Sequence, residues 1–326
     1  RHLDSRLRGN DKSKNRTMKD ITLKPPSLRS ATAKGRVRLS AQGLAMIAEG
    51  RVDKGNVQEC ARVAGLMAVK HTSDWLPHCH PIPILDADLQ FVLEDDAIAI
   101  EARVRTIAST GVEMEALTAV SAAALTVYDM MKPHMLAAEM SIEGIHLAEK
   151  TGGKSDFART VNGAGAVVLV MSDTVAAGKK PDTAGKSVSD GLSAAGFAIA
   201  AYEVLPDEPT QIAARVTHWL QQGVALIVTV GGTGVSPRDK TIEAVKPLLI
   251  TELPGLMEAA RNFGQQRTPY AMLSRGIAGL AGQNSVVMTF PGSRKGAEES
   301  LAAVLPGLVH LIKACRWGQP HKGGYE

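Results

Sequence analysis

Two charged residues follow a helical segment that is otherwise without charge, and they are of the types that transfer protons. Residues 116–128 contain no Asp, Glu, Lys or Arg, and Asp129 and Lys132 come directly after. Residues three apart share one face of a helix, so these two side chains can pair. Acids at the start and a cation at the end of a helix complement its dipole, which accounts for Glu113 and Lys132. The dipole does not account for Asp129, because charge at the end of a buried helix is costly unless it is paired or used. A lysine buried in this way can have a lowered pKa and act as an acid or base.

A second group of potentially reactive side chains lies on a proline-rich loop, where His78, Cys79 and His80 follow one another. The prolines around them favour an extended backbone. The two histidines could share a zinc or iron ion with Cys79 or Cys60, but a tetrahedral site needs three or four ligands. This half of the chain has no second His-x-His pair and no Cys-x-x-Cys pair. We favour a role for His80 in binding phosphate or moving a proton, and a structural role for His78.

In the second half, polar residues and glycines follow predicted buried strands at residues 166–171, 197–204 and 224–230. Ligands of open α/β sheets bind beyond the carboxyl ends of the strands. Glycine lets backbone amides approach a phosphate, although a lone Gly-Gly-Thr-Gly can also be only a tight turn. Two carboxylates beside it could hold Mg²⁺. The residues in question are Ser172, Asp173, Asp207, Gly231, Gly232, Thr233, Gly234 and Asp239.

The elements that must position these groups indicate two domains joined by a glycine-rich stretch at residues 151–165. In the first half, alternating segments at 85–93 and 98–106 predict an antiparallel hairpin, with helices at 57–70 and 116–132. Short strands are expected at 18–26 and 36–39. The second half alternates strands with helices at 183–195 and 209–222, which is typical of an open, mostly parallel α/β sheet. We assign residues 18–156 and 165–316 to the domains, 157–164 to the linker, 1–17 to a disordered extension with Met18 as a candidate start, and 317–326 to a polar tail.

Composition excludes several classes of function. The chain has 326 residues, a formal net charge of +4 and no basic stripe interleaved with aromatics, so nucleic acid is not an expected partner. No apolar run approaches the roughly 20 residues of a membrane helix, and no secretory signal is visible. Three cysteines without a Cys-x-x-Cys pair do not suggest a disulfide framework. We expect a cytoplasmic protein with small-molecule substrates.

The first half resembles the cyclic pyranopterin monophosphate synthase (MoaC) family. The motifs that carry the resemblance are Lys54-Gly55, Ala64-Gly65, Leu76-Pro77-His78-Cys79-His80-Pro81, Gly111-Val112-Glu113-Met114-Glu115-Ala116-Leu117-Thr118-Ala119, Tyr128-Asp129-Met130-Met131-Lys132 and Gly152-Gly153-Lys154-Ser155. The resemblance implies a step of molybdenum cofactor biosynthesis, a lyase reaction in which cyclised dihydro-GTP (3',8-cyclo-7,8-dihydro-GTP) becomes cyclic pyranopterin monophosphate and pyrophosphate leaves. It also implies a ferredoxin-like α+β fold and a hexamer that needs no metal or other cofactor and has active sites at subunit interfaces.

By position in these motifs, Lys54 and Lys132 would be the catalytic acid and base, and Asp129 would orient Lys132. The resemblance implies that His80, Lys70 and Lys154 bind the triphosphate of the substrate. It also implies that the three residues starting at Glu113 contact the pterin end of the substrate. The candidate substrate-binding residues of this half are Lys70, His78, Cys79, His80, Glu113, Met114, Glu115 and Lys154. The sequence departs from the family at Asn56, where Asp is usual, and at Pro133-His134 after the catalytic lysine.

The second half, from about residue 165 to 315, resembles the molybdopterin-binding domain of the MogA/MoaB family. The motifs are Ser172-Asp173, Asp182-Thr183-Ala184-Gly185, Pro206-Asp207, Gly231-Gly232-Thr233-Gly234, Arg238-Asp239, Pro254-Gly255, Leu273-Ser274-Arg275 and Pro291-Gly292-Ser293. Active members of this family are trimeric nucleotidyltransferases that adenylylate molybdopterin with Mg-ATP. The resemblance makes Asp207 and Asp239 catalytic or Mg²⁺-coordinating and lets the glycine loop and Ser293 hold phosphate or pterin.

The sequence therefore predicts a bifunctional enzyme of molybdenum cofactor biosynthesis that forms a homo-oligomer, either hexameric or built on trimers. The expected cofactor is Mg²⁺ with ATP, in the second half. The alternative is that the second half only binds the pterin and delivers or shields it without chemistry. A weaker alternative is a metal-binding protein that uses His78 and His80.

Overall fold

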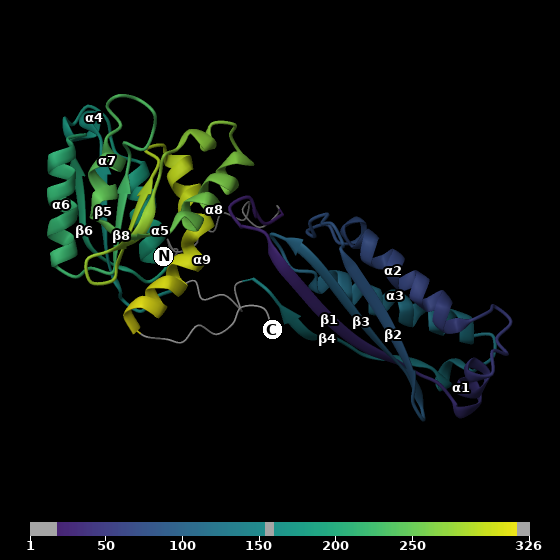
Figure 1. The fold of residues 1–326 in the computed structure, drawn as a ribbon. Helices are drawn as coiled ribbons and strands as arrows, with labels where there is room; N and C mark the ends of the chain where they lie inside the picture. Colours follow the sequence, from purple (N-terminus) through teal and green to yellow (C-terminus); the bar gives the residue numbers. More distant parts are fainter. Residues whose placement is uncertain (1–17, 154–159, 318–326) are drawn as a thin grey trace, which may run out of the picture. The chain divides into compact units, whose positions relative to one another are not determined.

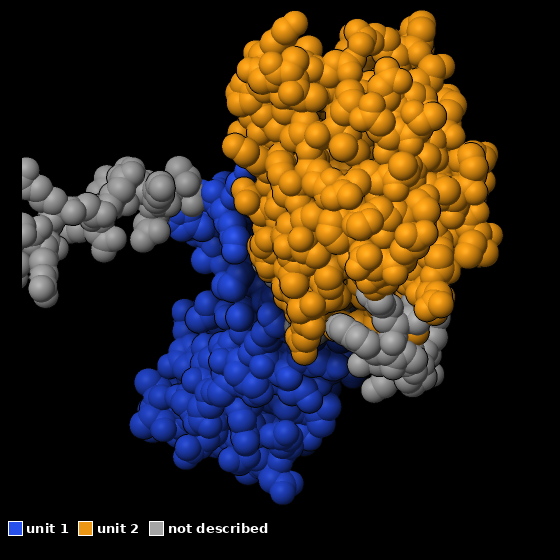
Figure 2. Space-filling view, turned by 90° about the vertical axis from the view of Figure 1, so that its left-hand side faces the viewer, with its two compact units in different colours: residues 1–156 blue, residues 157–326 orange. Residues whose placement is uncertain are grey.

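The computed structural model describes residues 18–153 and 160–317, and it divides into two compact units, residues 1–156 and 157–326 (Figure 2). Each unit has its own sheet and its own hydrophobic core. We describe them separately below.

The first unit is built on a four-stranded antiparallel sheet in the order β2-β3-β1-β4 (Figure 1). Helix α2 connects β1 to β2 and helix α3 connects β3 to β4. This β-α-β-β-α-β arrangement is the ferredoxin-like fold, as the sequence predicts. The elements are β1 (Ser27–Arg38), α1 (Ala41–Ala48), α2 (Val57–Trp75), β2 (Asp86–Leu93), β3 (Ala97–Ala108), α3 (Glu113–Met131), a 3-10 turn η3 (Ala137–Glu139) and β4 (Ser141–Thr151).

Helices α2 and α3 lie next to each other and pack on the sheet through small side chains. Ala116, Ala119 and Ala123 of α3 are fully buried, as is Ala61 of α2. A Cβ atom on Gly65 would overlap the side chain of Leu89 and lie 3.1 Å from the backbone carbonyl oxygen of Ala119. The axes of the two helices can therefore approach closely only because these side chains are small.

Side chains at the starts of two helices satisfy backbone amides that have no partner within the helix. Ser40 accepts a hydrogen bond from the Gly43 amide at 3.3 Å and begins α1. Asn56 accepts one from the Glu59 amide at 3.0 Å and begins α2. Asn and Asp are about equally good at this position. The departure at Asn56 therefore preserves the helix start.

Several predicted boundaries in this unit are wrong, although the 85–93/98–106 hairpin is confirmed by the β2–β3 pairing. Residues 18–26 form no strand, and β1 begins only after the two prolines, which lack the amide hydrogen that a sheet needs. Helix α2 continues to Trp75 and α3 begins at Glu113, so Lys70 and Glu115 belong to helices. Strand β4 was not anticipated.

The second unit contains a six-stranded, mostly parallel sheet in the order β6-β5-β7-β10-β9-β8, which confirms the predicted open α/β architecture. Only β9 runs antiparallel to its neighbours β10 and β8. The elements are β5 (Gly165–Met171), α4 (Asp173–Ala176), α5 (Ala184–Ala194), β6 (Ala198–Leu205), α6 (Pro209–Gln221), β7 (Leu226–Val230), α7 (Thr241–Val245), η4 (Lys246–Leu248), β8 (Leu249–Glu252), α8 (Pro254–Gln265), η5 (Ala271–Leu273), β9 (Ala278–Ala281), β10 (Ser285–Phe290) and α9 (Arg294–Trp317).

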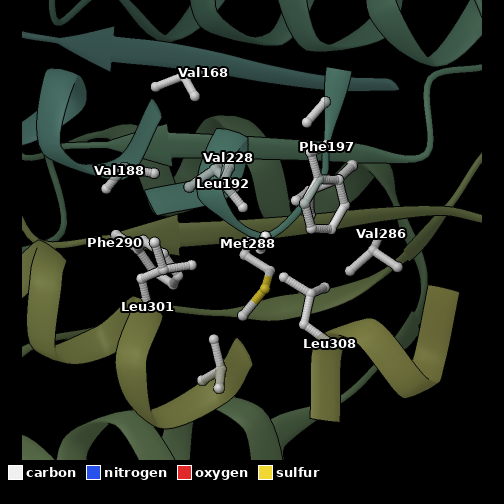
Figure 3. Close-up of a cluster of buried hydrophobic side chains, with 14 of the residues drawn as sticks. Val168, Val188, Leu192, Phe197, Val228, Val286, Met288, Phe290, Leu301 and Leu308 are labelled. Carbon is white, nitrogen blue, oxygen red and sulfur yellow. The ribbon is translucent and has the colours of Figure 1, made fainter. Parts of the chain in front are cut away.

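Both faces of this sheet are covered, and alternate residues of each central strand point to opposite layers. Val168 of β5 and Met288 of β10 pack with Leu192 of α5 and Leu308 of α9 on one face (Figure 3). Helices α6 and α7 cover the other face and meet the residues in between, such as Leu169. Strand β5 pairs with β6 on one side and with β7 on the other. The chain order therefore reverses between β5 and β7, where sheets of this kind bind ligands.

Within residues 18–153 and 160–317, no helix combines the length and the apolar character needed to cross a membrane.

We expect Gly65→Ala to lower the stability of the first unit. The added methyl group would gain about 1 kcal/mol of helix propensity. It would also push against Leu89 and the Ala119 carbonyl in a packed interior, where overpacking costs about 1 to 3 kcal/mol. Scanning calorimetry of the whole chain should show the first unit unfolding at a lower temperature.

Gly307→Ala in α9 is the matched control, because Gly307 is exposed and its new Cβ atom would have only an ordinary contact, 3.7 Å from Leu256. We expect this variant to be as stable as the natural chain or slightly more stable. A Gly65→Ala chain that unfolds at an unchanged temperature would contradict the close contact between the helices.

Candidate functional site

Two lysines share one carboxylate at the C-terminal end of α3. Lys132 places its Nζ 2.7 Å from Asp129 Oδ1. Lys54, from the segment before α2, places its Nζ 2.7 Å from Asp129 Oδ2 and 2.9 Å from the Asp129 carbonyl oxygen. The structure thus brings together the three residues expected to be catalytic in this half. Lys54 is 75 positions from Asp129 in the chain, and no local pattern in the sequence shows that they meet.

This cluster is open to solvent, which differs from the expectation of a buried charge. The side chains of Lys54, Asp129 and Lys132 are 40%, 53% and 57% exposed. Hydrogen bonds from Lys132 and then from Lys54 lower the pKa of Asp129 to about 2. The hydrogen bond to Asp129 raises the pKa of Lys132, so the suggestion of a lowered lysine pKa is wrong for this arrangement. At neutral pH the Asp129–Lys132 pair is fully charged.

Pro133 ends the helix without moving Lys132 away from its partner. Lys132 keeps a helical backbone conformation, and its amide donates to the Tyr128 carbonyl oxygen at 3.0 Å. Residues before proline usually avoid this conformation. In this chain Lys132 keeps the helical conformation even though Pro133 follows it. The departure at Pro133 is therefore compatible with the geometry that joins Lys132 to Asp129.

A second cluster surrounds a cavity of about 260 Å³ near the other end of the same helices. Lys70 of α2, Glu115 of α3 and His80 of the proline-rich loop line this cavity. Burial raises the pKa of Glu115, and the charge of Glu113 raises it further. The other lining residues are Val69, Ser73, Pro81 and Ile82.

The remaining candidates of this half lie around that cavity or away from it. Glu113 forms an ion pair with Lys150 of β4 at 3.3 Å, a residue that sequence reasoning missed because β4 was not predicted. Met114 is exposed. Burial and the charge of Glu115 raise the pKa of the Cys79 thiol. His78 is exposed and does not line the cavity, and Lys154 lies outside the described residues.

No group of three or more His, Cys, Asp and Glu side chains suited to a metal ion occurs within residues 18–153 and 160–317. His78 and His80 therefore lack the additional ligands that a tetrahedral site requires.

The two clusters are far apart within one chain. Glu115 and Asp129 are both on α3 and lie 14 positions apart, which corresponds to about 21 Å along a helix. The helices between the clusters are also not fully covered: Leu125 of α3 is 61% exposed and Val63 of α2 is 59% exposed. In a single chain, α3 is therefore not fully covered by the sheet and α2.

In the second unit, the loops after β5 and β6 are tied to each other by a reciprocal pair of hydrogen bonds. The Asp173 amide donates to Asp207 Oδ2 at 3.3 Å, and the Asp207 amide donates to Asp173 Oδ1 at 3.1 Å. Ser172 caps the short helix α4 by accepting from the Val175 amide at 3.4 Å. The guanidinium of Arg238 pairs with the Asp173 carboxylate from the third loop. These residues meet beyond the carboxyl ends of β5, β6 and β7, as predicted.

The glycine loop after β7 has a geometry that other residues could not adopt. Gly231 and Gly232 have φ angles of 109° and 64°, in the left-handed region that favours glycine. A Cβ atom on Gly231 would overlap the Met171 carbonyl group, and one on Gly232 would overlap the hydroxyl of Thr241. The tight turn itself therefore requires these two glycines.

Arg275 binds the backbone of this loop through its guanidinium group. Its Nε donates to the Gly234 carbonyl oxygen at 2.7 Å, and its Nη2 donates to the Asp239 carbonyl oxygen at 2.6 Å. Its Nη1 forms an ion pair with Glu243 at 2.5 Å. Because every nitrogen of this guanidinium group is engaged, Arg275 positions the loop, and we do not expect it to contact a substrate directly.

Asp207 and Asp239 retain carboxylate oxygens that could face a ligand. Asp207 Oδ1 is buried and has no hydrogen-bond partner among the described residues, while its Oδ2 accepts from Asp173. Burial raises the pKa of Asp207, and the charges of Asp173 and Asp239 raise it further. Asp239 uses Oδ2 to accept from the Ser236 amide at 2.8 Å. Oxygen ligands with spare acceptor capacity fit a Mg²⁺ ion that keeps several waters.

A cavity of about 280 Å³ lies beside the glycine loop, between α8, η5, the end of β10 and the start of α9. Ser274, Pro291 and Ser293 line it, as the sequence motifs suggest. Thr233 is buried in the loop itself. The other lining residues are Met257, Ala260, Arg261, Gly264, Thr268, Tyr270, Ala271, Gly296, Glu299 and Ser300. Most belong to helices α8 and α9, whose amphipathic pattern indicates only packing.

Comparison with known proteins gives each unit a family. Residues 18–153 match the MoaC family, and residues 167–310 match a family described as a probable molybdopterin binding domain. Each match covers the unit that carries the corresponding motifs.

Relatives with both halves are also found. A molybdenum cofactor biosynthesis bifunctional protein of Chlorobaculum tepidum is 43% identical over 299 residues, which is 90% of this chain and 93% of the relative. One from Synechococcus elongatus is 40% identical and covers 90% of this chain and 96% of its own. The cyclic pyranopterin monophosphate synthase of Thermomicrobium roseum is 47% identical over 156 residues, 47% of this chain and 89% of that protein. With its two matched units and this similarity along nearly its whole length, the chain belongs to the family of bifunctional molybdenum cofactor biosynthesis proteins.

Proposed function

We propose that the first unit converts cyclised dihydro-GTP to cyclic pyranopterin monophosphate. The observation that carries this proposal is the pairing of Lys54 and Lys132 with the single carboxylate of Asp129. A rearrangement of rings needs proton transfers at fixed positions, and the release of pyrophosphate needs cations near the leaving group. This cluster can supply both. Lys132 would be in its charged form when the substrate binds, because the hydrogen bond to Asp129 raises the pKa of that side chain.

The other end of the helix pair has the chemistry to bind the substrate. Lys70 and His80 can meet polyphosphate oxygens, and Glu115 can accept hydrogen bonds from the amino and ring N–H groups of a pterin-like ring. One substrate molecule cannot reach across about 21 Å to touch both clusters of one chain. We therefore propose that the active site combines Lys132 of one copy with Glu115 of a second copy in a homo-oligomer.

Exposed apolar side chains on the helices support this arrangement. Val63 and Met67 of α2 and Met114 and Leu125 of α3 are all at least 40% exposed. A twofold interface presents the same patch from both subunits, so two α3 helices could run antiparallel and bring opposite ends together. This would also cover the part of α3 that has no charge for contact with water.

Mixing two inactive variants should restore activity if the site is shared. We expect Lys132→Ala and Glu115→Gln chains each to lose pyranopterin formation when alone. Coexpressed and assembled at random, they should regain about a quarter of the natural activity, because each mixed pair has one intact and one doubly altered site. The assay measures cyclic pyranopterin monophosphate from cyclised dihydro-GTP.

A mixture of Lys132→Ala and Lys54→Ala chains is the control, because both residues belong to the same cluster and no intact site can form. Recovery in the control, or none in the test mixture, would argue against a shared site. Lys132→Ala should also leave the chemistry of the second unit unchanged.

The charge of Asp129 should set the pH at which Lys132 loses its proton. Removing that charge in Asp129→Asn deletes the interaction that raises the lysine pKa, so the pKa should fall. Competitive acetylation across a pH series, read by peptide mass spectrometry, reports the neutral amine directly. We expect Lys132 of the variant to become reactive at a lower pH than in the natural chain, with exposed Lys246 unchanged as an internal reference. Identical profiles would show that Asp129 does not stabilise the charged form.

For the second unit, we propose binding of molybdopterin and its adenylylation with Mg-ATP. The molybdopterin phosphate would attack the α-phosphorus of ATP, and pyrophosphate would leave. Backbone amides of residues 232–234 and the cavity beside this loop can place the two reactants, which is the main requirement of such a transfer. Mg²⁺, when bound by Asp207 and Asp239, would neutralise phosphate charge.

Asp239→Asn separates catalysis from binding in this unit. The amide oxygen of Asn can still accept the Ser236 hydrogen bond, so the loop should keep its shape while the negative charge is lost. With molybdopterin and Mg-ATP, we expect the natural whole chain to yield adenylylated pterin by mass and the variant to yield at least tenfold less. Molybdopterin binding should persist in both.

Asp190→Asn, an exposed carboxylate of α5, serves as the control and should retain full activity. If the natural chain binds molybdopterin but forms no product with Mg-ATP, the second unit is a pterin-binding domain without transferase chemistry.

A further inference from the structure

The cavity beside the glycine loop is lined by apolar side chains, by hydroxyl side chains, by one basic group, Arg261, and by one acidic group, Glu299. Met257 and Ala260 of α8 and Ala271 of η5 form apolar walls, and Glu299 of α9 brings a carboxylate to the same space. A cavity of about 280 Å³ is near the lower limit of small-molecule sites. It suits a flat bicyclic ring better than a complete dinucleotide.

The carboxylate of Glu299 lies close to α8 at the wall of the cavity. Its Oε2 lies 4.0 Å from the position that a Cβ atom on Gly264 would occupy. The neighbouring Glu298, by contrast, accepts from Ser187 at 2.6 Å and from Arg294 at 2.9 Å. Glu299 has no such partner among the residues that the structure describes. A half-buried carboxylate at the wall of a cavity can accept hydrogen bonds from a ligand.

The cavity continues directly to the glycine loop. Pro291 and Ser293 line it, and Gly292 between them lies against the loop, where a Cβ atom would come within 3.2 Å of Gly231 Cα. The Gly231 amide also donates to the Phe290 carbonyl oxygen at 2.9 Å. A molecule with its ring in the cavity can therefore extend a phosphate towards the loop amides.

We propose that Glu299 recognises the 2-amino-4-oxo edge of a pterin ring in this cavity. On that edge the 2-amino group and the adjacent ring N–H are two parallel donors, and one carboxylate can accept both. Adenine offers a donor next to an acceptor on its corresponding edge, so its ring nitrogen would face the carboxylate repulsively. Glu299 thereby directs the pterin into the cavity and keeps the adenine of ATP out. This inference rests on the proposed binding of molybdopterin by the second unit.

A pair of ligands that differ at this edge gives the test. Lumazine has the pterin ring system with an oxo group in place of the 2-amino group, so it presents an acceptor to Glu299. Both compounds are fluorescent and can be titrated with the whole chain. We expect pterin to bind about tenfold or more tightly than lumazine, because two hydrogen bonds to a charged group are involved. In Glu299→Gln this preference should fall to about twofold or less.

Glu298→Gln is the matched control, since it removes an adjacent carboxylate that points away to Ser187 and Arg294. It should keep the preference for pterin. The first unit is identical in all three chains, so differences between them report the second unit alone.

The inference fails if the natural chain binds pterin and lumazine equally, or if Glu299→Gln keeps the full preference. Either result leaves the proposed function intact as long as molybdopterin still binds. A natural chain whose second unit binds no molybdopterin would instead overturn the proposed function, and the inference with it.

Discussion

The close contact between α2 and α3 determines where the chemistry of the first unit can occur. Gly65 and Ala119 leave so little between the helices that their relative position is fixed. Because the two helices run in opposite directions, the residues before α2 meet those at the end of α3, which joins Lys54 to Asp129. The same packing places Lys70, near the end of α2, beside Glu115 at the start of α3. A contact without any polar group thus creates two polar clusters.

In the second unit, backbone geometry fixes the positions of the loops that carry the candidate site residues. Left-handed glycines bend the chain after β7 where a side chain would overlap Met171, and Arg275 fixes the outside of that bend. The reciprocal hydrogen bonds between Asp173 and Asp207 tie the two preceding loops together. Three loops from separate strands are therefore held together as one preorganised edge of the sheet.

Local sequence patterns predict much of this fold because they reflect local constraints. Alternation predicts the β2–β3 hairpin, and apolar runs followed by Gly, Ser or Asp predict the ends of β5 and β7. The sequence also indicates that Asp129 and Lys132 are neighbours, since they are three apart on one helix. The local pattern does not indicate that Lys54 joins them, because that contact depends on how α2 packs; only the family motifs assign Lys54 to the same site. The exposure of α3 and the cavity around Glu299 likewise arise from tertiary packing, and an amphipathic pattern alone cannot distinguish a cavity wall from a core.

Helices α2 and α3 each contain 19 residues. This shared length limits where the sequence can gain or lose residues. One inserted residue in the middle of α3 would rotate everything beyond it by about 100° and shift it by about 1.5 Å. Asp129 would turn away from Lys54 while Glu115 stayed in place. The number of residues between the clusters is therefore itself a constrained quantity. In this unit, insertions and deletions should be excluded from the paired helices even where substitutions are tolerated.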